Sequence, residues 1–203
     1  MLFGASRLAD PSYKIMSETL ILRPPAMEDF TAWSSLRGAS RAFLEPWEPA
    51  WLADDLAKPS FRRRLRRYNR EMTADEAVTF LVFARADGAL LGGLTIGNIR
   101  RGVAQMATLG YWMGERHAGK GVMTEAVTLA CRFGFARMGL RRIEAACLPE
   151  NAASVRLLEK AGFRPEGQAR EYLCIAGRWR DHLLFARLAA DAPVIAPAAR
   201  LPT

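Results

Sequence analysis

The chain has 203 residues, of which half are apolar and a quarter are charged. This length suits one domain, and the composition is that of a folded globular protein. No apolar run reaches the ~18 residues that a membrane-spanning helix needs, and residues 1–16 hold no long apolar segment of the secretory kind. Three widely spaced cysteines and two histidines exclude a disulfide framework and a multi-histidine metal site. We therefore expect a cytoplasmic protein with no metal and no membrane contact.

The net charge is +8, from 29 Lys and Arg residues against 21 Asp and Glu residues. Such an excess favours encounter with polyanions, for example nucleic acid or phosphorylated cofactors. Its most concentrated part is an arginine-rich segment, Arg62–Arg70. Because Leu65 and Tyr68 interrupt this segment at helical spacing, it is either the solvated face of an amphipathic helix or a docking surface for a polyanion.

The apolar pattern predicts a mixed order of elements along the chain. After a loose leader over residues 1–17, we expect one folded domain over residues 18–189 and an Ala- and Pro-rich tail over residues 190–203. The expected strands cover residues 19–23, 78–86, 90–99, 107–113, 142–148, 167–175 and 179–188, and the expected helices cover residues 27–36, 61–70, 122–136 and 152–161. Regular alternation of strands and helices is absent, so the expected fold class is α+β rather than doubly wound or a TIM barrel.

Residues 114–124 join an expected strand to the clearest expected helix. Gly119 and Gly121 let backbone N–H groups approach an anion, and the first helical turn offers unpaired donors at the positive end of the helix dipole. Arg116 and Lys120 add positive charge. The segment therefore predicts an anion-binding loop, although a plain strand–helix connection would also tolerate these glycines.

Two common phosphate-binding motifs do not match this loop. The Walker A pattern requires Ser or Thr after Lys120, but position 121 is glycine, so the hydroxyl that holds Mg²⁺ is missing. The dinucleotide pattern GxGxxG lacks its third glycine. The loop instead satisfies the pattern [RQ]xxGx[GA] through Arg116, Gly119 and Gly121.

This pattern resembles the pyrophosphate loop of the GCN5-related N-acetyltransferase (GNAT) superfamily. The segment Asn151-x-x-Ser154, with Ala161-Gly162-Phe163 after it, is similar to the second cofactor motif of that superfamily. Residues 18–23 are similar to the strand that opens RimJ/RimL-type enzymes, and residues 43–49, 124–126 and 171–182 are similar to the RimJ branch of those enzymes. Those enzymes acetylate the N-terminal alanine of ribosomal proteins.

The resemblance implies the GNAT fold, a mixed and mostly antiparallel sheet with flanking helices that is splayed between two central strands. It also implies acetyl-CoA as co-substrate and direct attack of a primary amine on the thioester, without a metal. The cofactor contacts that it implies are Gly110, Tyr111, Trp112, Arg116, Ala118, Gly119, Lys120, Gly121, Val122, Thr124, Asn151 and Ser154. Asn151 is in addition a good N-cap for the helix that follows it.

The resemblance also supplies candidates for the catalytic groups. It places Ser154 where a hydroxyl can protonate the leaving CoA thiolate, and Glu171 on the strand that carries a carboxylate base in RimL-type enzymes. Alignment on Gly177 would instead put Leu173 at that position, so this register stays open. Glu48 is a further candidate for the base.

Three residues are expected to bind the acceptor by the same resemblance: Glu45, which is also a minor candidate for the base, Trp47 and Tyr172. Trp47 could equally be a core residue. Asp181 and His182 are adjacent on an expected strand and point to opposite faces. We therefore expect them to serve the fold or a dimer contact rather than to form a catalytic dyad.

The function expected from this resemblance is acetylation of an N-terminal α-amine, with alanine of a ribosomal protein as acceptor. An α-amine has a pKa of about 7.7–8.0, against about 10.4 for lysine, so it needs only modest help from a base. The alternatives are acetylation of a small-molecule amine, a catalytically inactive ribosome-assembly or RNA-binding module, and a purine-nucleotide binder. As an enzyme of this type the chain would be a monomer or homodimer, and Arg62–Arg70 could contact ribosomal RNA.

Overall fold

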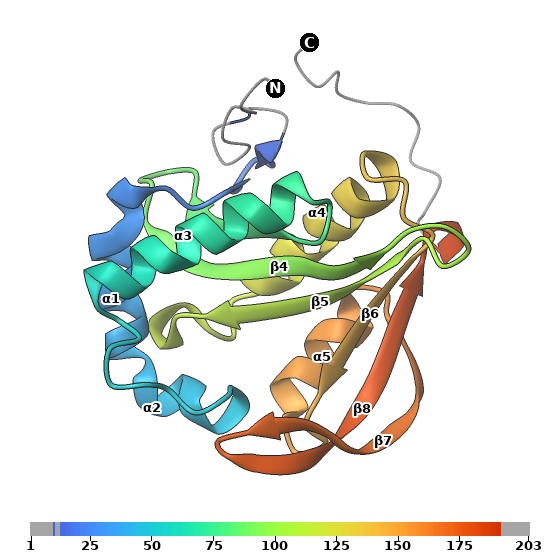
Figure 1. Ribbon diagram of the computed structural model, residues 1–203. Coiled ribbons are helices and arrows are strands. Elements are labelled where there is room, and N and C mark those ends of the chain that lie inside the picture. The colour runs from blue at the N-terminus through green and yellow to red at the C-terminus, as the bar shows by residue number, and fades with distance from the viewer. Residues whose placement is uncertain (1–9, 11–12, 192–203) are drawn as a thin grey trace.

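The computed structural model describes residue 10 and residues 13–191, and these form one eight-stranded sheet with helices on both faces (Figure 1). The strand order is β1-β2-β3-β4-β5-β6-β8-β7, and every neighbouring pair is antiparallel except β5 and β6. The strands are β1 (Ile15–Met16), β2 (Leu20–Arg23), β3 (Val78–Ala84), β4 (Leu90–Arg100), β5 (Met106–Met113), β6 (Arg142–Cys147), β7 (Arg164–Ile175) and β8 (Arg178–Leu188). The sheet is therefore mixed and mostly antiparallel, as the resemblance to the GNAT superfamily implies.

The helices cover the two faces of the sheet in separate groups (Figure 1). Helices α4 and α5 pack on one face, and α1 and α3 pack on the other, with α2 and a 3-10 turn at the end of α1. The helices are α1 (Phe30–Ala39), α2 (Arg41–Leu44), α3 (Lys58–Thr73), α4 (Val122–Ala136) and α5 (Ala152–Lys160), with 3-10 turns at Met27–Asp29, Glu45–Trp47, Glu115–His117 and Ala189–Asp191. No helix of the described residues is long and apolar enough to span a membrane.

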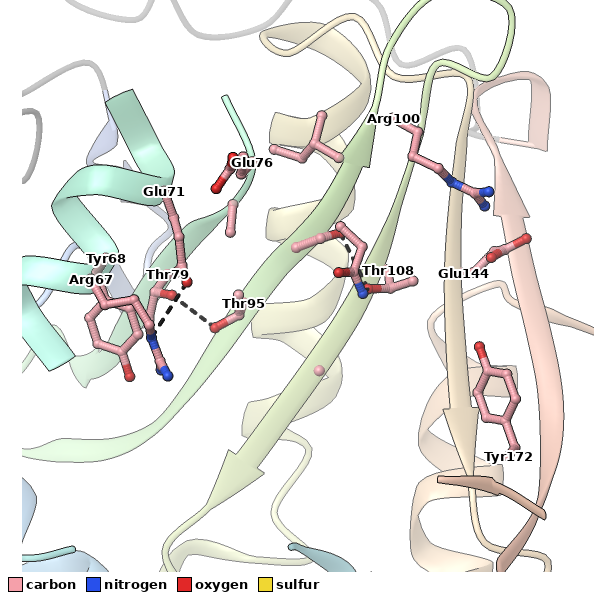
Figure 2. A pocket seen from close by; sticks show the side chains of 15 residues that line it. Arg67, Tyr68, Glu71, Glu76, Thr79, Thr95, Arg100, Thr108, Glu144 and Tyr172 are labelled. Atoms are coloured by element: carbon pink, nitrogen blue, oxygen red, sulfur yellow. Dashed lines mark hydrogen bonds and ion pairs between the residues drawn. The ribbon is translucent and has the colours of Figure 1, made fainter. Parts of the chain in front are cut away.

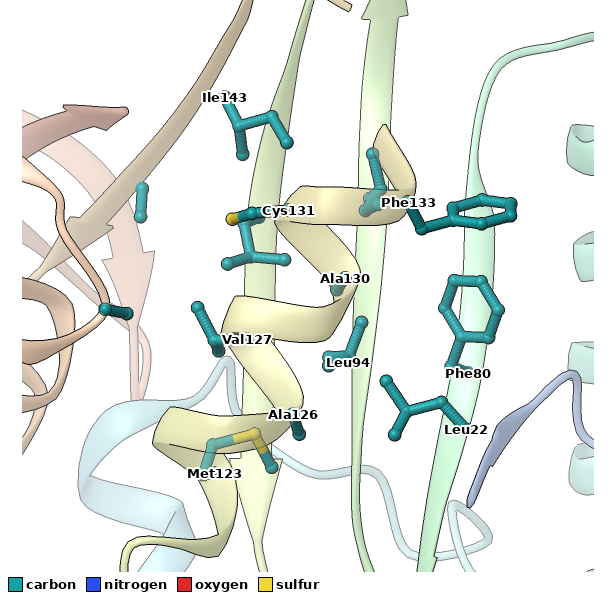
Figure 3. Packing of buried hydrophobic residues seen from close by; sticks show 14 of the residues in the cluster. Leu22, Phe80, Leu94, Met123, Ala126, Val127, Ala130, Cys131, Phe133 and Ile143 are labelled. Atoms are coloured by element: carbon teal, nitrogen blue, oxygen red, sulfur yellow. The ribbon is translucent and has the colours of Figure 1, made fainter. Parts of the chain in front are cut away.

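Strand β3 is buried on both faces, which explains its almost unbroken apolar sequence. Val78, Phe80 and Val82 belong to the main core beneath α4, whereas Leu81 and Phe83 belong to a second cluster beneath α1 and α3. The ring of Phe80 meets that of Phe133 edge to face, with 5.6 Å between centroids (Figure 3). The two clusters fix both helical layers to the same strand.

The parallel pair of β5 and β6 diverges soon after it begins. Only three positions pair, and the last of them joins Thr108 to Glu144. Beyond that point β5 continues beside β4 to Met113, while β6 continues beside β8 to Cys147. We call the space between the two strands after the pair Thr108–Glu144 the splay. It agrees with the sheet geometry that the GNAT resemblance implies.

Some predicted boundaries change in the structure. Residues 15–16, which the sequence places in the loose leader, pair with β2 as β1, whereas residues 1–9, 11 and 12 and the tail beyond residue 191 lie outside the described residues. The helix predicted over residues 27–36 begins at Phe30 after a 3-10 turn, because the buried Asp29 carboxylate binds the Ala26 N–H and the Arg23 guanidinium. The short α2 is absent from the prediction, since four residues hold too little periodicity.

Replacement of Phe80 by alanine should lower the free energy of unfolding by about 3–5 kcal/mol, because the ring is fully buried and its loss leaves a cavity against Phe133. Chemical denaturation measures this change. Val103→Ala is the control, since Val103 is fully exposed and should change stability by less than about 0.5 kcal/mol. A loss below about 1 kcal/mol for Phe80→Ala would contradict the packing described.

Candidate active site

The loop between β5 and α4 has the geometry of an anion site. Gly119 and Gly121 adopt positive φ values of 75° and 78°, and a Cβ atom at either position would enter open space. Gly121 is the N-cap of α4 and has no side chain to accept from the first helical N–H groups. These donors therefore face outward without an internal partner.

Two cations flank this helix start. The Lys120 ammonium donates to the Arg116 carbonyl at 3.0 Å, and the Arg116 Nε donates to the ring Nε2 of His117 at 2.9 Å. Burial, and then the charges of Arg116 and Lys120, lower the pKa of His117. The imidazole is thus disfavoured as a third cation, and the positive charge rests on the guanidinium and the ammonium. A diphosphate fits this set of donors.

Strand β5 directs two unpaired amides into the splay. The Gly114 N–H donates to the Leu91 carbonyl on β4 at 2.9 Å, and the β4–β5 register runs without a shift from there to Thr108. Because amides alternate in direction along a strand, even-numbered amides of β5 face β4, and those of Tyr111 and Met113 face the splay. Within the predicted cofactor segment of residues 110–112, only the middle residue therefore offers its N–H to a ligand there.

Ser154 and Tyr111 meet on the α4–α5 side of the splay. Burial raises the pKa of the Tyr111 phenol to about 12, and the Ser154 hydroxyl, which lies near the phenol, opposes part of this rise. Asn151 caps α5 as the sequence predicts, because its Oδ1 accepts the Ser154 N–H at 3.0 Å. This cap fixes the first turn of α5, so the Ser154 hydroxyl is held beside the phenol.

A cleft of about 890 Å³ lies on the opposite face of the sheet (Figure 2). Its floor is formed by strand residues that include Thr79, Thr95, Thr108 and Gly110, and Gly110 opens it toward the splay because a Cβ there would meet nothing within 4 Å. The walls come from α3 on one side and from β6 and β7 on the other. The wall residues with polar or charged side chains include Arg67, Tyr68, Glu71, Glu144 and Tyr172.

The predicted base Glu171 lies outside the lining of this cleft, whereas its neighbour Tyr172 is part of it. A bulge separates the paired positions Ala169 and Leu173 on β7. Glu171 sits in this bulge at a φ of 45°, and its N–H donates to Asp181 Oδ1 at 2.9 Å. Its side chain is exposed. This placement does not favour Glu171 as the base, and its role stays a prediction.

Glu48 is bound to other side chains. Its carboxylate accepts from the Arg37 guanidinium at 2.5 Å and from Trp51 Nε1 at 2.9 Å, while the Arg37 guanidinium also stacks on the Trp51 ring at 4.4 Å. The Glu48 carbonyl accepts the Ala176 N–H at 3.0 Å and so joins this segment to the β7–β8 turn. The carboxylate therefore serves the fold more directly than it serves proton transfer.

Two other residues that are predicted to bind the acceptor, Trp47 and Glu45, lie outside the cleft lining. Trp47 is more than a third exposed, which rules out a core role, and Glu45 pairs with Arg41 on the surface. Neither lines the cleft, so their contact with an acceptor stays a prediction. His182 is buried edge-on against Tyr172, with 5.7 Å between ring centroids. Asp181 and His182 thus support β7 and its tyrosine, in line with the expected role in the fold.

Thr79, Thr95 and Thr108 on the cleft floor and Glu144 on the β6 wall are not among the residues predicted from the sequence. Thr79 and Thr95 share a hydrogen bond of 3.0 Å. Thr79 interrupts the otherwise apolar β3, and Thr95 interrupts the apolar part of β4 over residues 90–96, which is a signal of a polar face. Glu144 gives a similar signal, because it lies between the buried residues Ile143 and Ala145. Among the described residues, no group of three or more His, Cys, Asp or Glu side chains is placed to hold a metal ion.

The family model "Acetyltransferase (GNAT) domain" matches residues 19–164. The chain is a GNAT acetyltransferase. This match spans the anion loop, the splay and the Asn151–Ser154 segment together. The GNAT chain is accordingly an enzyme that transfers acetyl to an amine, and its co-substrate is acetyl-CoA.

Curated relatives agree with this assignment. The protein "Probable N-acetyltransferase YjcK" of Bacillus subtilis is 36% identical over 177 residues, which cover 87% of this chain and 98% of the relative. The "[Ribosomal protein uS5]-alanine N-acetyltransferase" of Escherichia coli is 33% identical over 183 residues, which cover 89% and 93% of the two chains. The GNAT resemblance and its RimJ/RimL character, inferred from motifs, are confirmed by these relatives.

Solved structures show the same fold. RimJ of Mycobacterium smegmatis, in complex with CoA-disulfide, has a TM-score of 0.81 and 37% identity, with 86% of this chain and 84% of that chain covered. The ribosomal-protein-S5-alanine acetyltransferase of Vibrio fischeri also has a TM-score of 0.81, with 28% identity and coverage of 88% and 97%.

Replacement of Gly121 by glutamate should weaken CoA binding about 100-fold or more, because a carboxylate beside the diphosphate adds like-charge repulsion of several kcal/mol. Isothermal titration calorimetry with CoA measures the change. Gly88→Glu is the matched control, since Gly88 has a similar φ of 72° and open space but lies in the β3–β4 turn. CoA affinity retained in Gly121→Glu, or lost equally in Gly88→Glu, would contradict the assigned loop.

Proposed function

We propose that this enzyme acetylates the N-terminal α-amine of a protein, with alanine of a ribosomal protein as the acceptor. The observation that carries the proposal is the cleft on the face opposite the cofactor loop, which is open to solvent and reaches the splay at Gly110. A chain end can lie along such a cleft and present its amine at the splay. Ribosomal proteins would be met in the cytoplasm.

The names of two relatives support this acceptor class. The curated relative from Escherichia coli is named for alanine of ribosomal protein uS5, and the Vibrio fischeri structure is named for alanine of ribosomal protein S5. Both are similar to this chain over most of their length. An α-amine is neutral in about a tenth of molecules at neutral pH, which suits a site with modest base assistance.

The geometry supports specific roles for the residues on the cofactor side. The loop residues 116–122 and the first turn of α4 with Thr124 would bind the CoA diphosphate through backbone amides and two cations. The Tyr111 N–H would donate to the thioester oxygen as an oxyanion-hole group, a contribution of a few kcal/mol. The Ser154 hydroxyl, held beside the Tyr111 phenol, would protonate the departing thiolate.

Incubation with acetyl-CoA should acetylate an Ala-starting peptide at its N-terminal nitrogen and leave its lysine side chains unmodified, because at neutral pH well under a thousandth of lysine amines are neutral. Mass spectrometry of fragment ions locates the acetyl group. The same peptide with a blocked N-terminus is the control and should not react. Acetylation of a lysine ε-amine, or turnover with small amines only, would overturn the acceptor assignment.

We also propose that α3 contacts ribosomal RNA. Three of its arginines, Arg63, Arg64 and Arg67, form ion pairs with carboxylates. Among the residues that the structure describes, no carboxylate is within ion-pair distance of Arg62, Arg66 or Arg70, which are exposed and follow one another at intervals of four residues. These three arginines form one basic row along the helix, with about 6 Å of helix rise between successive members.

Neutralisation of the row in Arg62→Gln/Arg66→Gln/Arg70→Gln should reduce the slope of log affinity against log salt by about 2 for purified ribosomal RNA, because each lost phosphate contact removes about 0.7–0.9. Filter binding over a salt series measures the slope. The control changes three exposed arginines elsewhere, Arg132, Arg137 and Arg141, by the same charge. Equal slopes for the two triple variants would remove the row as an RNA contact.

A further inference from the structure

We infer that Glu144 on β6 is the carboxylate that binds the acceptor amine and takes its proton. The inference rests on the proposed function, in that the acceptor is an amine that reaches the splay through the cleft. Glu144 lines that cleft, and its position is set by the sheet rather than by a flexible loop.

The register puts Glu144 where the two substrates meet. Its partner on β5 is Thr108, and this pair is the last one before the strands diverge. Gly110, which opens the cleft floor to the splay, follows two residues later on the same face of β5. A group at position 144 is therefore fixed at the vertex of the splay, on the acceptor side.

The other carboxylates of the cleft lie elsewhere. Glu71 belongs to α3 and pairs with Arg67 at 3.4 Å, and Glu76 precedes β3 at the far wall. Figure 2 shows both on the α3 side, across the floor from Glu144. Of the carboxylates that line the cleft, only that of Glu144 stands on a strand that borders the splay.

Arg142 fixes the orientation of Glu144. The Arg142 Nε donates to Glu144 Oε1 at 2.8 Å, and its Nη1 donates to Glu166 Oε1 at 2.9 Å. No described residue bonds to the second carboxylate oxygen of Glu144, and the side chain is 30% exposed. One oxygen is thus anchored and the other is accessible to an amine, the arrangement that proton transfer needs.

The groups around Glu144 suit a cationic ligand. In Figure 2 the Tyr172 ring points along the cleft toward Glu144, and its contact with the buried His182 holds it there. The nearby Arg100 guanidinium donates to the Met106 sulfur rather than to this carboxylate. An ammonium group would therefore meet a carboxylate oxygen and an aromatic ring, a pair that favours cations.

The proton balance assigns each group one step. An ammonium acceptor loses two protons when it becomes an amide. Glu144 takes the first, which leaves a neutral amine to attack the thioester; the C–N bond then forms and the C–S bond breaks. The second proton leaves nitrogen for water in this step, and Ser154, which gives its hydroxyl proton to the thiolate, regains a proton from water. Glu144 finally releases its proton to water.

The test compares Glu144→Gln with Glu166→Gln. Both changes remove one acceptor of Arg142, but Glu166 lies outside the cleft lining. Steady-state kinetics with acetyl-CoA and an Ala-starting peptide should show kcat/KM for the peptide reduced about 100-fold or more in Glu144→Gln. The KM for acetyl-CoA should stay unchanged. Glu166→Gln should keep kcat/KM within about threefold, and equal losses in both variants would show that only the Arg142 pairing matters.

A second acceptor separates proton transfer from structural damage. A peptide with a hydrazine group at its N-terminus has a lower nitrogen pKa and arrives mostly neutral, so Glu144→Gln should lose much less activity with it. The shorter Glu144→Asp should recover part of the activity with the ordinary peptide. Should Glu144→Gln fail to fold, the comparison of the two acceptors with Glu144→Asp decides instead. Loss that is equal for both acceptors would overturn the role.

An error in the proposed function would be detected separately from an error in the role of Glu144. In that case the wild-type enzyme would acetylate a small amine but not the peptide. The Glu144 comparison is then run on that small amine, with the same expected loss. Activity of Glu144→Gln within threefold of wild type, on whichever amine the wild type acetylates, would refute the inference alone.

Discussion

The early end of the β5–β6 ladder is the constraint on which the rest of the structure depends. A parallel pair that stops after Thr108 and Glu144 leaves backbone amides of β5 without strand partners, and unpaired amides need other ones. Those of Tyr111 and Met113 face the gap, and the Ser154 hydroxyl lies near the phenol of Tyr111. On the other face the missing side chain of Gly110 opens the same point to the cleft. The sheet therefore has one place that ligands can reach from both sides.

The two faces also differ in charge. On the α4 side, Arg116, Lys120 and uncapped helical amides gather positive potential around the loop. On the α3 side, the cleft combines threonine hydroxyls with three carboxylates and two guanidinium groups, those of Glu71, Glu76, Glu144, Arg67 and Arg100. The proposed roles of the two faces are compatible with this difference, since an anionic co-substrate would be attracted to the loop and a cationic amine to the carboxylates of the cleft. The net charge of +8 does not reveal this difference between the faces, because most of the arginines lie outside both sites.

How far the sequence could predict the site differs between its two halves. The cofactor side is predictable from residues that are close together in the chain. Two glycines, two cations and a helix start lie within a few residues of one another, and Asn151 precedes Ser154 by about one helical turn. The acceptor side depends on long-range pairing. Glu171 looked suitable on its strand, but the β7 bulge bonded to Asp181 places it outside the cleft lining. Glu48 is a second candidate for the base, yet Arg37 and Trp51 donate hydrogen bonds to its carboxylate.

The sequence by itself determined the order of elements, the α+β class, the anion loop and the family, because periodicity, caps and glycine positions act over a few residues. Tertiary structure alone decided which amides face the splay, which carboxylates are already paired and that Glu144 stands at its vertex. Strand register brings together residues that are far apart in the chain. A shift of one residue would turn each side chain to the other face, and no local pattern fixes that choice.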